Sequence, residues 1–330
     1  MILICYGTRP EWIKVKPIIN ELKKRNIYHK TLFTGQHKDI VTDKADFNFE
    51  IDDGICNNRL NNVVSNLMSI PDEFFDNITH VLIQGDTTSV LSIAINSFHR
   101  KIKIIHLEAG LRTYDFNNPY PEEMNRQLVS RITDIHLCPT KNNHDNLIKE
   151  NCTGVKYIVG NTALDNLKDI KTEYTDTVLI TLHRRENHDI IDKWFTNFSK
   201  LAKKNKNLKF ILPLHPNPNV KKHKNILKNI EVVDPLSHSE LIEKLSKCKI
   251  VITDSGGIQE EASFLNKRTI ICRNITERPE SLESNGILCK YPNDLFEIFE
   301  FAKNNYEIDL ECPYGDGNSS VKIVDILSKL

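Results

Sequence analysis

Short apolar runs that recur along the whole chain constrain its fold more than any other feature. Each run is rich in Ile, Val and Leu, ends in Gly, Asp, His or Ser, and is followed by a stretch of helical character. This alternation is typical of parallel strands joined by crossover helices. The predicted strands lie at 2–6, 28–34, 80–84, 102–107, 135–139 and 157–159, and then at 177–182, 208–214, 230–233, 250–253 and 269–272.

The two series of strands predict two α/β domains. The 330 residues of the chain agree with this number, because one domain usually takes about 150 residues. A polar stretch at 161–176 separates the series and is interpreted as a helix that runs into a linker. We therefore expect one domain at 1–168 and a second at 169–314. The segment 319–330 has the pattern of an amphipathic helix, which must cover apolar surface.

Composition excludes several classes of protein. Basic and acidic residues balance at 44 each, so the chain lacks the positive field that holds nucleic acid. The eight cysteines include no CxxC pair, which argues against a zinc ribbon or a disulfide framework. No run of about 18 apolar residues is present, as a membrane-spanning helix would require. We expect a soluble, cytoplasmic protein.

Polar residues stand where the predicted strands of the first half end, and ligands of parallel α/β sheets bind at those ends. Arg9 and the free amides of the next helix can hold an anion, although Arg9 alone could equally be a surface side chain. Asp86 and Glu108 bring two carboxylates to one sheet edge, which favours proton chemistry, unless Asp86 simply caps a helix. Glu122 and Arg126 stand four apart, and the alternative for them is an exposed ion pair.

The second half repeats this arrangement. His183 and two arginines follow one predicted strand and His215 follows another; a structural histidine is the usual alternative. The strand at 250–253 runs into Ser255-Gly256-Gly257 and then a helix, whose first amides can cradle a diphosphate. A plain helix cap explains Ser255 but not the paired glycines. Glu261, one turn further, could accept hydrogen bonds from ribose hydroxyls.

Ten motifs in a fixed order carry a family resemblance. They are GTRPEWIK, TGQH, GDTT, HLEAGLRT, PYPEEMNR, GNTALD, HRREN, LHPNP, TDSGGIQEEA and TERPE. Together they resemble the UDP-N-acetylglucosamine 2-epimerase family across nearly the whole chain. An ordered set of this length is far more specific than any one motif.

The resemblance implies a fold and a reaction. The fold is of the glycosyltransferase-B type, with two Rossmann-like domains that face each other across a cleft and a C-terminal helix, at 315–330, that crosses back to the first domain. The reaction inverts C2 of a UDP-N-acetyl-hexosamine by anti elimination of UDP, which gives a 2-acetamidoglycal, and syn readdition. It requires a positioned base and stabilisation of the departing diphosphate. No cofactor and no metal are expected, and the family habit is a homodimer.

The resemblance also implies roles for single residues. Asp86, Glu108 and Glu122 match the acid/base set, with Arg126 and His183 beside them, and which carboxylate takes the proton stays open. The residues that match the substrate and UDP site are Arg9, Lys14, Arg184, His215, Ser255, Gly256, Gly257, Glu261 and Arg278.

Two departures from the family pattern concern regulation and substrate. The bacterial enzymes are activated by their own substrate near the TGQH segment, where Gln36 and His37 remain as candidate regulatory residues. Asp39 and Asn66 replace other members of that site, which argues against substrate activation. The stretch at 46–66 is also shorter than in the family. Both changes fit a different UDP-sugar, such as a 6-deoxy-L-hexosamine.

Three other functions compete with a non-hydrolysing epimerase. A hydrolysing epimerase would use the same carboxylates in a wetter site and release UDP and free N-acetylmannosamine. A glycosyltransferase of the same architecture would not need the Asp86, Glu108 and Glu122 cluster and would require an acceptor. A non-catalytic UDP-sugar sensor is disfavoured, because every expected acid and base is present.

Overall fold

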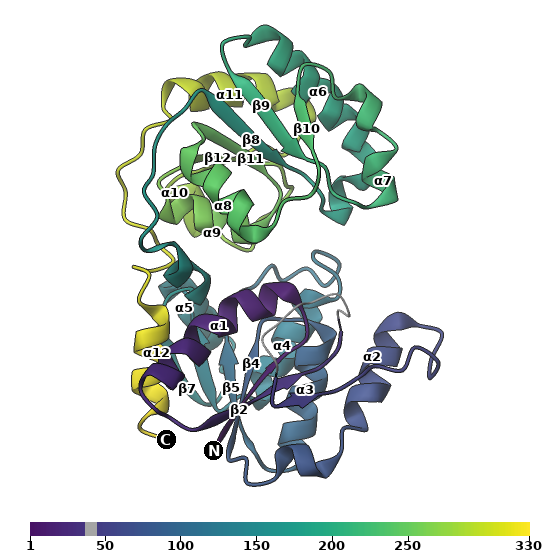
Figure 1. Ribbon diagram of the computed structural model, residues 1–330, viewed down its shortest axis with the longest axis vertical. Helices are drawn as coiled ribbons and strands as arrows, with labels where there is room; N and C mark the ends of the chain where they lie inside the picture. Colours follow the sequence, from purple (N-terminus) through teal and green to yellow (C-terminus); the bar gives the residue numbers. More distant parts are fainter. Residues whose placement is uncertain (37–44) are drawn as a thin grey trace. The chain divides into compact units, whose positions relative to one another are not determined.

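The computed structural model describes residues 1–36 and 45–330, and the chain divides into two compact units. Unit 1 comprises Met1–Asn166 and Gly315–Leu330, and unit 2 comprises Leu167–Tyr314. Each unit is a parallel sheet with helices packed against it (Figure 1), which confirms the predicted α/β class. Among the described residues, no helix combines the length and the apolar character needed to cross a membrane.

Unit 1 is built on one sheet of parallel strands. They are β1 (Ile2–Tyr6), β2 (His29–Phe33), β3 (Phe47–Asn48), β4 (His80–Gln84), β5 (Lys103–Leu107), β6 (Ile135–Cys138) and β7 (Val155–Ile158). Within the described residues they pair in the order β3-β2-β1-β4-β5-β6-β7. The order reverses between β1 and β4, and this switch point is where parallel α/β sheets bind ligands.

Alternate side chains of each buried strand point to opposite faces of the sheet. Ile2 and Ile4 of β1 pack on one face in a cluster with α1 and α12, whereas Leu3 and Cys5 pack on the other with α2, α3 and α4. Unit 1 therefore has one apolar layer on each side of its sheet. Its α-helices are α1 (Arg9–Lys24), α2 (Arg59–Met68), α3 (Thr88–His99), α4 (Glu122–Ile132), α5 (Lys141–Lys149) and α12 (Ser319–Leu327). It also contains the 3₁₀ helices η1 (Asp72–Phe75) and η2 (Thr162–Leu167). The end of η2 runs into unit 2.

Helix α12 completes unit 1 although it follows unit 2 in the sequence. Ile323, Val324 and Leu327 are buried in the same apolar cluster as α1. Asp165 holds the start of this helix, because its carboxylate accepts hydrogen bonds from the amides of Ser319 (3.0 Å) and Ser320 (2.6 Å). An acidic side chain at a helix N-terminus is favourable for the helix dipole.

Unit 2 repeats the same topology. Its strands are β8 (Thr177–Thr181), β9 (Lys209–Pro213), β10 (Glu231–Val233), β11 (Ile250–Thr253), β12 (Arg268–Ile271) and β13 (Gly286–Leu288), in the order β10-β9-β8-β11-β12-β13. Its helices are α6 (Ile191–Lys204), α7 (Pro218–Lys221), α8 (His238–Lys247), α9 (Gly256–Phe264), α10 (Glu280–Glu283) and α11 (Leu295–Asn304), with 3₁₀ helices η3 (Arg185–Ile190), η4 (Lys224–Ile226) and η5 (Pro292–Asp294). The switch point lies between β8 and β11.

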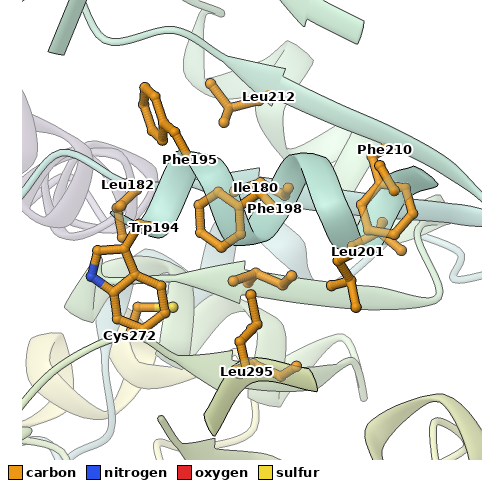
Figure 2. Close-up of a cluster of buried hydrophobic side chains, with 14 of the residues drawn as sticks. Ile180, Leu182, Trp194, Phe195, Phe198, Leu201, Phe210, Leu212, Cys272 and Leu295 are labelled. Atoms are coloured by element: carbon orange, nitrogen blue, oxygen red, sulfur yellow. The ribbon is translucent and has the colours of Figure 1, made fainter. Parts of the chain in front are cut away.

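Aromatic side chains of α6 fill the core on one face of this sheet. Trp194, Phe195 and Phe198 are fully buried and pack over Ile180 of β8 and Leu295 of α11 (Figure 2). The ring centroids of Trp194 and Phe198 lie 5.9 Å apart in a stacked arrangement. Such rings bury large apolar areas, so they contribute much of the stability of unit 2.

A buried carboxylate closes the loop after β1. The amides of Gly7 (2.6 Å) and Thr8 (3.2 Å) donate to one oxygen of Glu11, and the amide of Glu11 donates to the hydroxyl of Thr8, which forms a capping box at the start of α1. The other oxygen of Glu11 accepts a hydrogen bond of 2.8 Å from the hydroxyl of Thr87, which follows β4. Burial raises the pKa of the Glu11 carboxyl to about 7.

Phe198→Ala is expected to destabilise unit 2 by about 3–5 kcal/mol, because it removes a buried ring and leaves a cavity. Phe301→Ala in α11 is a matched control, since this ring is 55% exposed, and it should change the free energy of unfolding by less than about 0.5 kcal/mol. Urea unfolding measures both. If both variants lost the same free energy of unfolding, Phe198 would not lie in a buried core.

Glu11→Gln is expected to change how stability depends on pH. The folded protein holds a proton on Glu11 up to about pH 7, whereas the unfolded chain releases it near pH 4.5. This contribution to stability is therefore complete below about pH 4.5 and is lost as the pH rises to about 7.

Glutamine keeps an acceptor for the Gly7 and Thr8 amides and does not titrate. The difference in free energy of unfolding between Glu11→Gln and wild type should grow by on the order of 3 kcal/mol between pH 4.5 and 8. The exposed Glu50 supplies the control Glu50→Gln, which should run parallel to wild type. A constant difference for Glu11→Gln would show that this carboxyl does not titrate in that window.

Candidate functional site

Two carboxylates of unit 1 follow neighbouring strands at one sheet edge. Asp86 comes two residues after the end of β4 and Glu108 comes directly after β5, and β4 and β5 are paired in register, with Gln84 opposite Leu107. The structure thus brings both predicted carboxylates to the same edge. The alternative in which Asp86 caps the next helix is wrong, because Thr87 is the N-cap of α3.

Glu108 is fixed by its partners and by its backbone. The ammonium group of Lys14 lies 2.5 Å from Oε1 of Glu108, and the Gln84 amide donates a hydrogen bond to Oε2. Both side chains of the ion pair are largely buried, at 13% and 10% exposure. Glu108 has a φ of 66°, a left-handed conformation that is costly for a residue with a Cβ and is found preferentially at functional sites.

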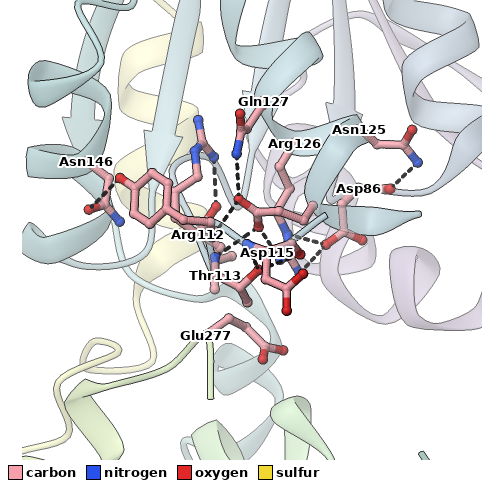
Figure 3. A network of polar contacts seen from close by, with 12 residues as sticks. Asp86, Arg112, Thr113, Asp115, Asn125, Arg126, Gln127, Asn146 and Glu277 are labelled. Atoms are coloured by element: carbon pink, nitrogen blue, oxygen red, sulfur yellow. Dashed lines mark hydrogen bonds and ion pairs between the residues drawn. The ribbon is translucent and has the colours of Figure 1, made fainter. Parts of the chain in front are cut away.

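Asp86 is held by a buried guanidinium. Nε and Nη2 of Arg126 both lie 2.7 Å from Oδ2 of Asp86, and Nη1 of Arg126 donates to the fully buried Glu123 at 3.1 Å (Figure 3). Glu123 also accepts hydrogen bonds from the amides of Thr113 and Tyr114. Arg126 is therefore not part of an exposed ion pair, and Glu123, which was not predicted, connects it to the loop after β5.

The remaining predicted residues of unit 1 occupy the starts of two helices. Helix α4 begins at Glu122, directly after Pro121, and Glu122 is half-buried. Arg9 is exposed at the first position of α1. The amides of Gly7 and Thr8, which precede this helix, both donate to Glu11.

The candidate regulatory residues are only partly described. Gln36 accepts hydrogen bonds from the hydroxyl and the amide of Ser89, whereas His37 and Asp39 lie outside the described residues. Asn66 is 4% exposed, and its amide group bonds to the backbone of Asp52 through both Oδ1 (2.8 Å) and Nδ2 (3.0 Å). The side chain of Asn66, on α2, therefore holds the preceding loop that contains Asp52.

A buried aspartate organises the switch point of unit 2. Asp254 follows β11, is fully buried, and accepts hydrogen bonds from the amides of His183 (3.0 Å) and Arg184 (2.8 Å), which follow β8. The Asn187 side chain donates to the same carboxylate at 3.0 Å and accepts from the indole of Trp194 at 3.1 Å. The position of the loop after β8 is thereby tied to the aromatic core. Asp254 stands in the TDSGG motif, but its role was not predicted.

The two predicted histidines of unit 2 lie against each other. The rings of His183 and His215 are stacked, with centroids 5.3 Å apart and planes inclined by 15°. Burial lowers the pKa of both imidazoles below their usual value of 6.5, so both are neutral at pH 7. A neutral imidazole can take up a proton and return it once it is protonated, which suits acid/base chemistry.

The two glycines at the start of α9 have different surroundings. A Cβ on Gly256 would lie 2.3 Å from Nη1 of Arg278, so a larger residue there requires the Arg278 side chain to move, whereas a Cβ on Gly257 would have no atom of the described residues within 4 Å. Ser255 occupies the N-cap position of α9, as the helix-cap alternative expects, but its side chain makes no capping hydrogen bond within the described residues. The start of α9 thus presents a hydroxyl and open space beside Gly257.

Buried ion pairs surround this turn. Arg278 pairs with Glu260 at 2.6 Å and with Glu277 at 2.5 Å, and Nη2 of Arg184 lies 4.0 Å from Glu277. Nε of Arg184 is buried and has no hydrogen-bond partner among the described residues, a state that costs free energy unless a ligand accepts from it. Glu261, at 8% exposure, pairs with His238 at 2.7 Å.

Comparison with known proteins places this arrangement in a family. Residues 20–328 match the protein family described as UDP-N-acetylglucosamine 2-epimerase. The UDP-N-acetylglucosamine 2-epimerase of Neisseria meningitidis is 35% identical over 379 aligned positions that cover 99% of each chain. The enzyme of that name from Campylobacter jejuni is also 35% identical and covers 99% of this chain and 97% of its own.

A solved structure agrees with the sequence relatives. The Neisseria meningitidis UDP-GlcNAc 2-epimerase bound to UDP-GlcNAc superposes with a TM-score of 0.87 at 33% identity and covers 100% of both chains. The ordered sequence motifs, the two parallel sheets and the whole-length similarity all indicate the same family. The chain belongs to the UDP-N-acetylglucosamine 2-epimerase family.

Proposed function

We propose that this enzyme inverts C2 of UDP-N-acetylglucosamine without net hydrolysis and gives UDP-N-acetylmannosamine. The observation that carries the proposal is the placement of Asp86 and Glu108 at one sheet edge, each held by a buried cation. A glycosyltransferase has no step that needs such a pair, whereas removal of a proton from carbon does.

Unit 2 is the proposed nucleotide-binding domain. The diphosphate of UDP would lie at the start of α9, where the Ser255 hydroxyl and the open space beside Gly257 meet the positive end of the helix dipole. The buried Nε of Arg184 would gain an acceptor there. Arg278 and His215 line this proposed site, and Glu261 would accept from the ribose. The UDP-GlcNAc bound to the Neisseria meningitidis relative supports this ligand class.

Unit 1 supplies the proposed acid/base chemistry. A carboxylate among Asp86, Glu108 and Glu122 takes the C2 proton; the C–H electron pair forms a C1=C2 double bond, and the C1–O bond breaks with its electrons leaving on UDP. The 2-acetamidoglycal that results is then attacked at C1 by the UDP oxygen, while a proton is added to the opposite face of C2. Charge on the leaving diphosphate must be stabilised throughout.

Cations and imidazoles support these steps in the proposal. Lys14 and Arg126 hold two of the carboxylates in fixed positions, and Arg9 offers an exposed positive charge for the substrate. His183, neutral at pH 7, is available for proton transfer. We further propose a cytoplasmic homodimer. A 6-deoxy-L-hexosamine linked to UDP remains the alternative substrate.

Deuterium exchange tests the reaction. In heavy water the wild-type enzyme should incorporate deuterium at C2 of UDP-N-acetylglucosamine without any acceptor, as followed by proton NMR. Asp86→Asn and Glu108→Gln should each lower this rate by at least about 100-fold, as expected for loss of an acid/base group, while UDP affinity by calorimetry stays within about twofold.

Asp145→Asn is the matched control, because Asp145 lies 50% exposed on α5 and should exchange at the wild-type rate. Phosphorus NMR on the same samples should show no build-up of free UDP. Stoichiometric UDP release would indicate the hydrolysing reaction, and absence of deuterium with every UDP-aminosugar supplied would refute the epimerase chemistry.

The paired glycines test the diphosphate site. Gly257→Ala should fold as well as wild type or gain up to about 1 kcal/mol, since alanine favours helix and no atom obstructs it, but its methyl group should weaken UDP binding by more than tenfold. Gly256→Ala should instead lose about 1–3 kcal/mol of stability, because Arg278 must move.

Ser255→Trp should abolish UDP binding by filling the same space. Urea unfolding and calorimetry separate the two effects of the glycine variants. Unchanged UDP affinity in Gly257→Ala would place the diphosphate elsewhere.

A further inference from the structure

Glu261 does not stand alone in unit 2. Its Oε1 lies 2.7 Å from Nε2 of His238, the first residue of α8. A carboxylate can only accept, so the imidazole donates this hydrogen bond through Nε2. The contact joins the first turn of α8 to the second turn of α9, and both helices start at the carboxyl edge of the sheet, where ligands of parallel sheets bind.

The pair is more than a surface ion pair. Glu261 is 8% exposed and His238 is 26% exposed, and a carboxylate so deeply buried needs a partner to offset its loss of hydration. The histidine is itself held on a fixed backbone, because Ser237 and Glu240 form a capping box at the start of α8, with the Ser237 amide donating to Glu240 at 2.7 Å. The backbone that carries the imidazole is therefore fixed at the start of α8.

We propose that His238 is a positioning residue that orients the Glu261 carboxylate toward the ribose hydroxyls and so makes the enzyme select ribonucleotides over deoxyribonucleotides. This inference rests on the proposed role of Glu261 as the ribose contact. A glutamate side chain has three rotatable bonds, and one hydrogen bond from His238 to Oε1 fixes the direction in which Oε2 points. A fixed acceptor favours a hydroxyl and is left unsatisfied by an analogue that lacks it.

Without His238, the carboxylate can turn away or recruit water, so it no longer penalises the analogue. The expected signature is a loss of discrimination, because UDP binds more weakly while the deoxy analogue binds as before. A purely structural role would instead weaken both ligands by the same factor. The ratio of the two dissociation constants therefore separates the two roles.

Calorimetry with UDP and 2′,3′-dideoxy-UDP on four proteins tests the proposal. Wild type should prefer UDP by at least about tenfold. His238→Phe keeps a ring but removes the donor, and the preference should fall below about twofold. His238→Gln, whose amide can donate from a similar position, should retain most of it. Glu261→Leu removes the acceptor at similar volume and should lose the preference as well.

Each outcome decides one claim. If His238→Phe keeps the wild-type ratio, or weakens both ligands equally, while Glu261→Leu loses the ratio, the positioning role of His238 is overturned and the ribose contact stands. If Glu261→Leu also keeps the wild-type ratio, the ribose contact itself is wrong. Thermal unfolding of every variant shows whether unit 2 has remained folded.

Discussion

One buried carboxylate at the switch point of each sheet holds together the loops on which the candidate site depends. In unit 1, Glu11 accepts from the loop after β1 and from Thr87 after β4. In unit 2, Asp254 after β11 accepts from the two amides that follow β8. Parallel sheets leave these strand ends without a ladder partner, so a side chain must satisfy their amides. In unit 1 the accepting carboxyl group follows the first strand of the switch point, β1, whereas in unit 2 it follows the second strand, β11.

The surrounding charges follow from this design. Arg126 lies between Asp86 and Glu123, and Arg278 lies between Glu260 and Glu277. Buried ion pairs add little to stability compared with apolar packing, so their number is better explained by orientation than by folding energy. A carboxylate that must meet one proton on one carbon benefits from a guanidinium that prevents its rotation. These buried ion pairs therefore hold the carboxylates in fixed orientations.

Every strand that the sequence predicts appears in the structure, including the short β10. The prediction missed β3, which has two residues, and β13, which has three and begins with Gly286. Both are shorter than the runs of about 4–8 residues from which strands are predicted. The edge strand β7 begins two residues earlier than predicted, because Val155 and Ile158 are exposed and burial does not mark its limits.

Candidate site residues could be picked out from the sequence where they follow a strand, and not where their placement depends on a partner distant in the sequence. Asp86, Glu108 and His183 follow strands, so the pattern indicated them directly. Glu123, Asp254 and His238 make hydrogen bonds between separate segments of the chain, and no local spacing reveals such contacts. The sequence places Ser255 at a helix cap as well as in the paired-glycine turn, and only the structure shows that its side chain makes no capping hydrogen bond within the described residues.

The capture of α12 by Asp165 has a consequence for biogenesis. Unit 2 is one continuous segment, whereas unit 1 receives its last helix only after all of unit 2 has left the ribosome. Until then the apolar side of α1 that Ile323, Val324 and Leu327 cover stays open to water, and exposed apolar surface invites association with other nascent chains. The segment made first is thus the one completed last, and chaperones would meet the newborn protein at this face.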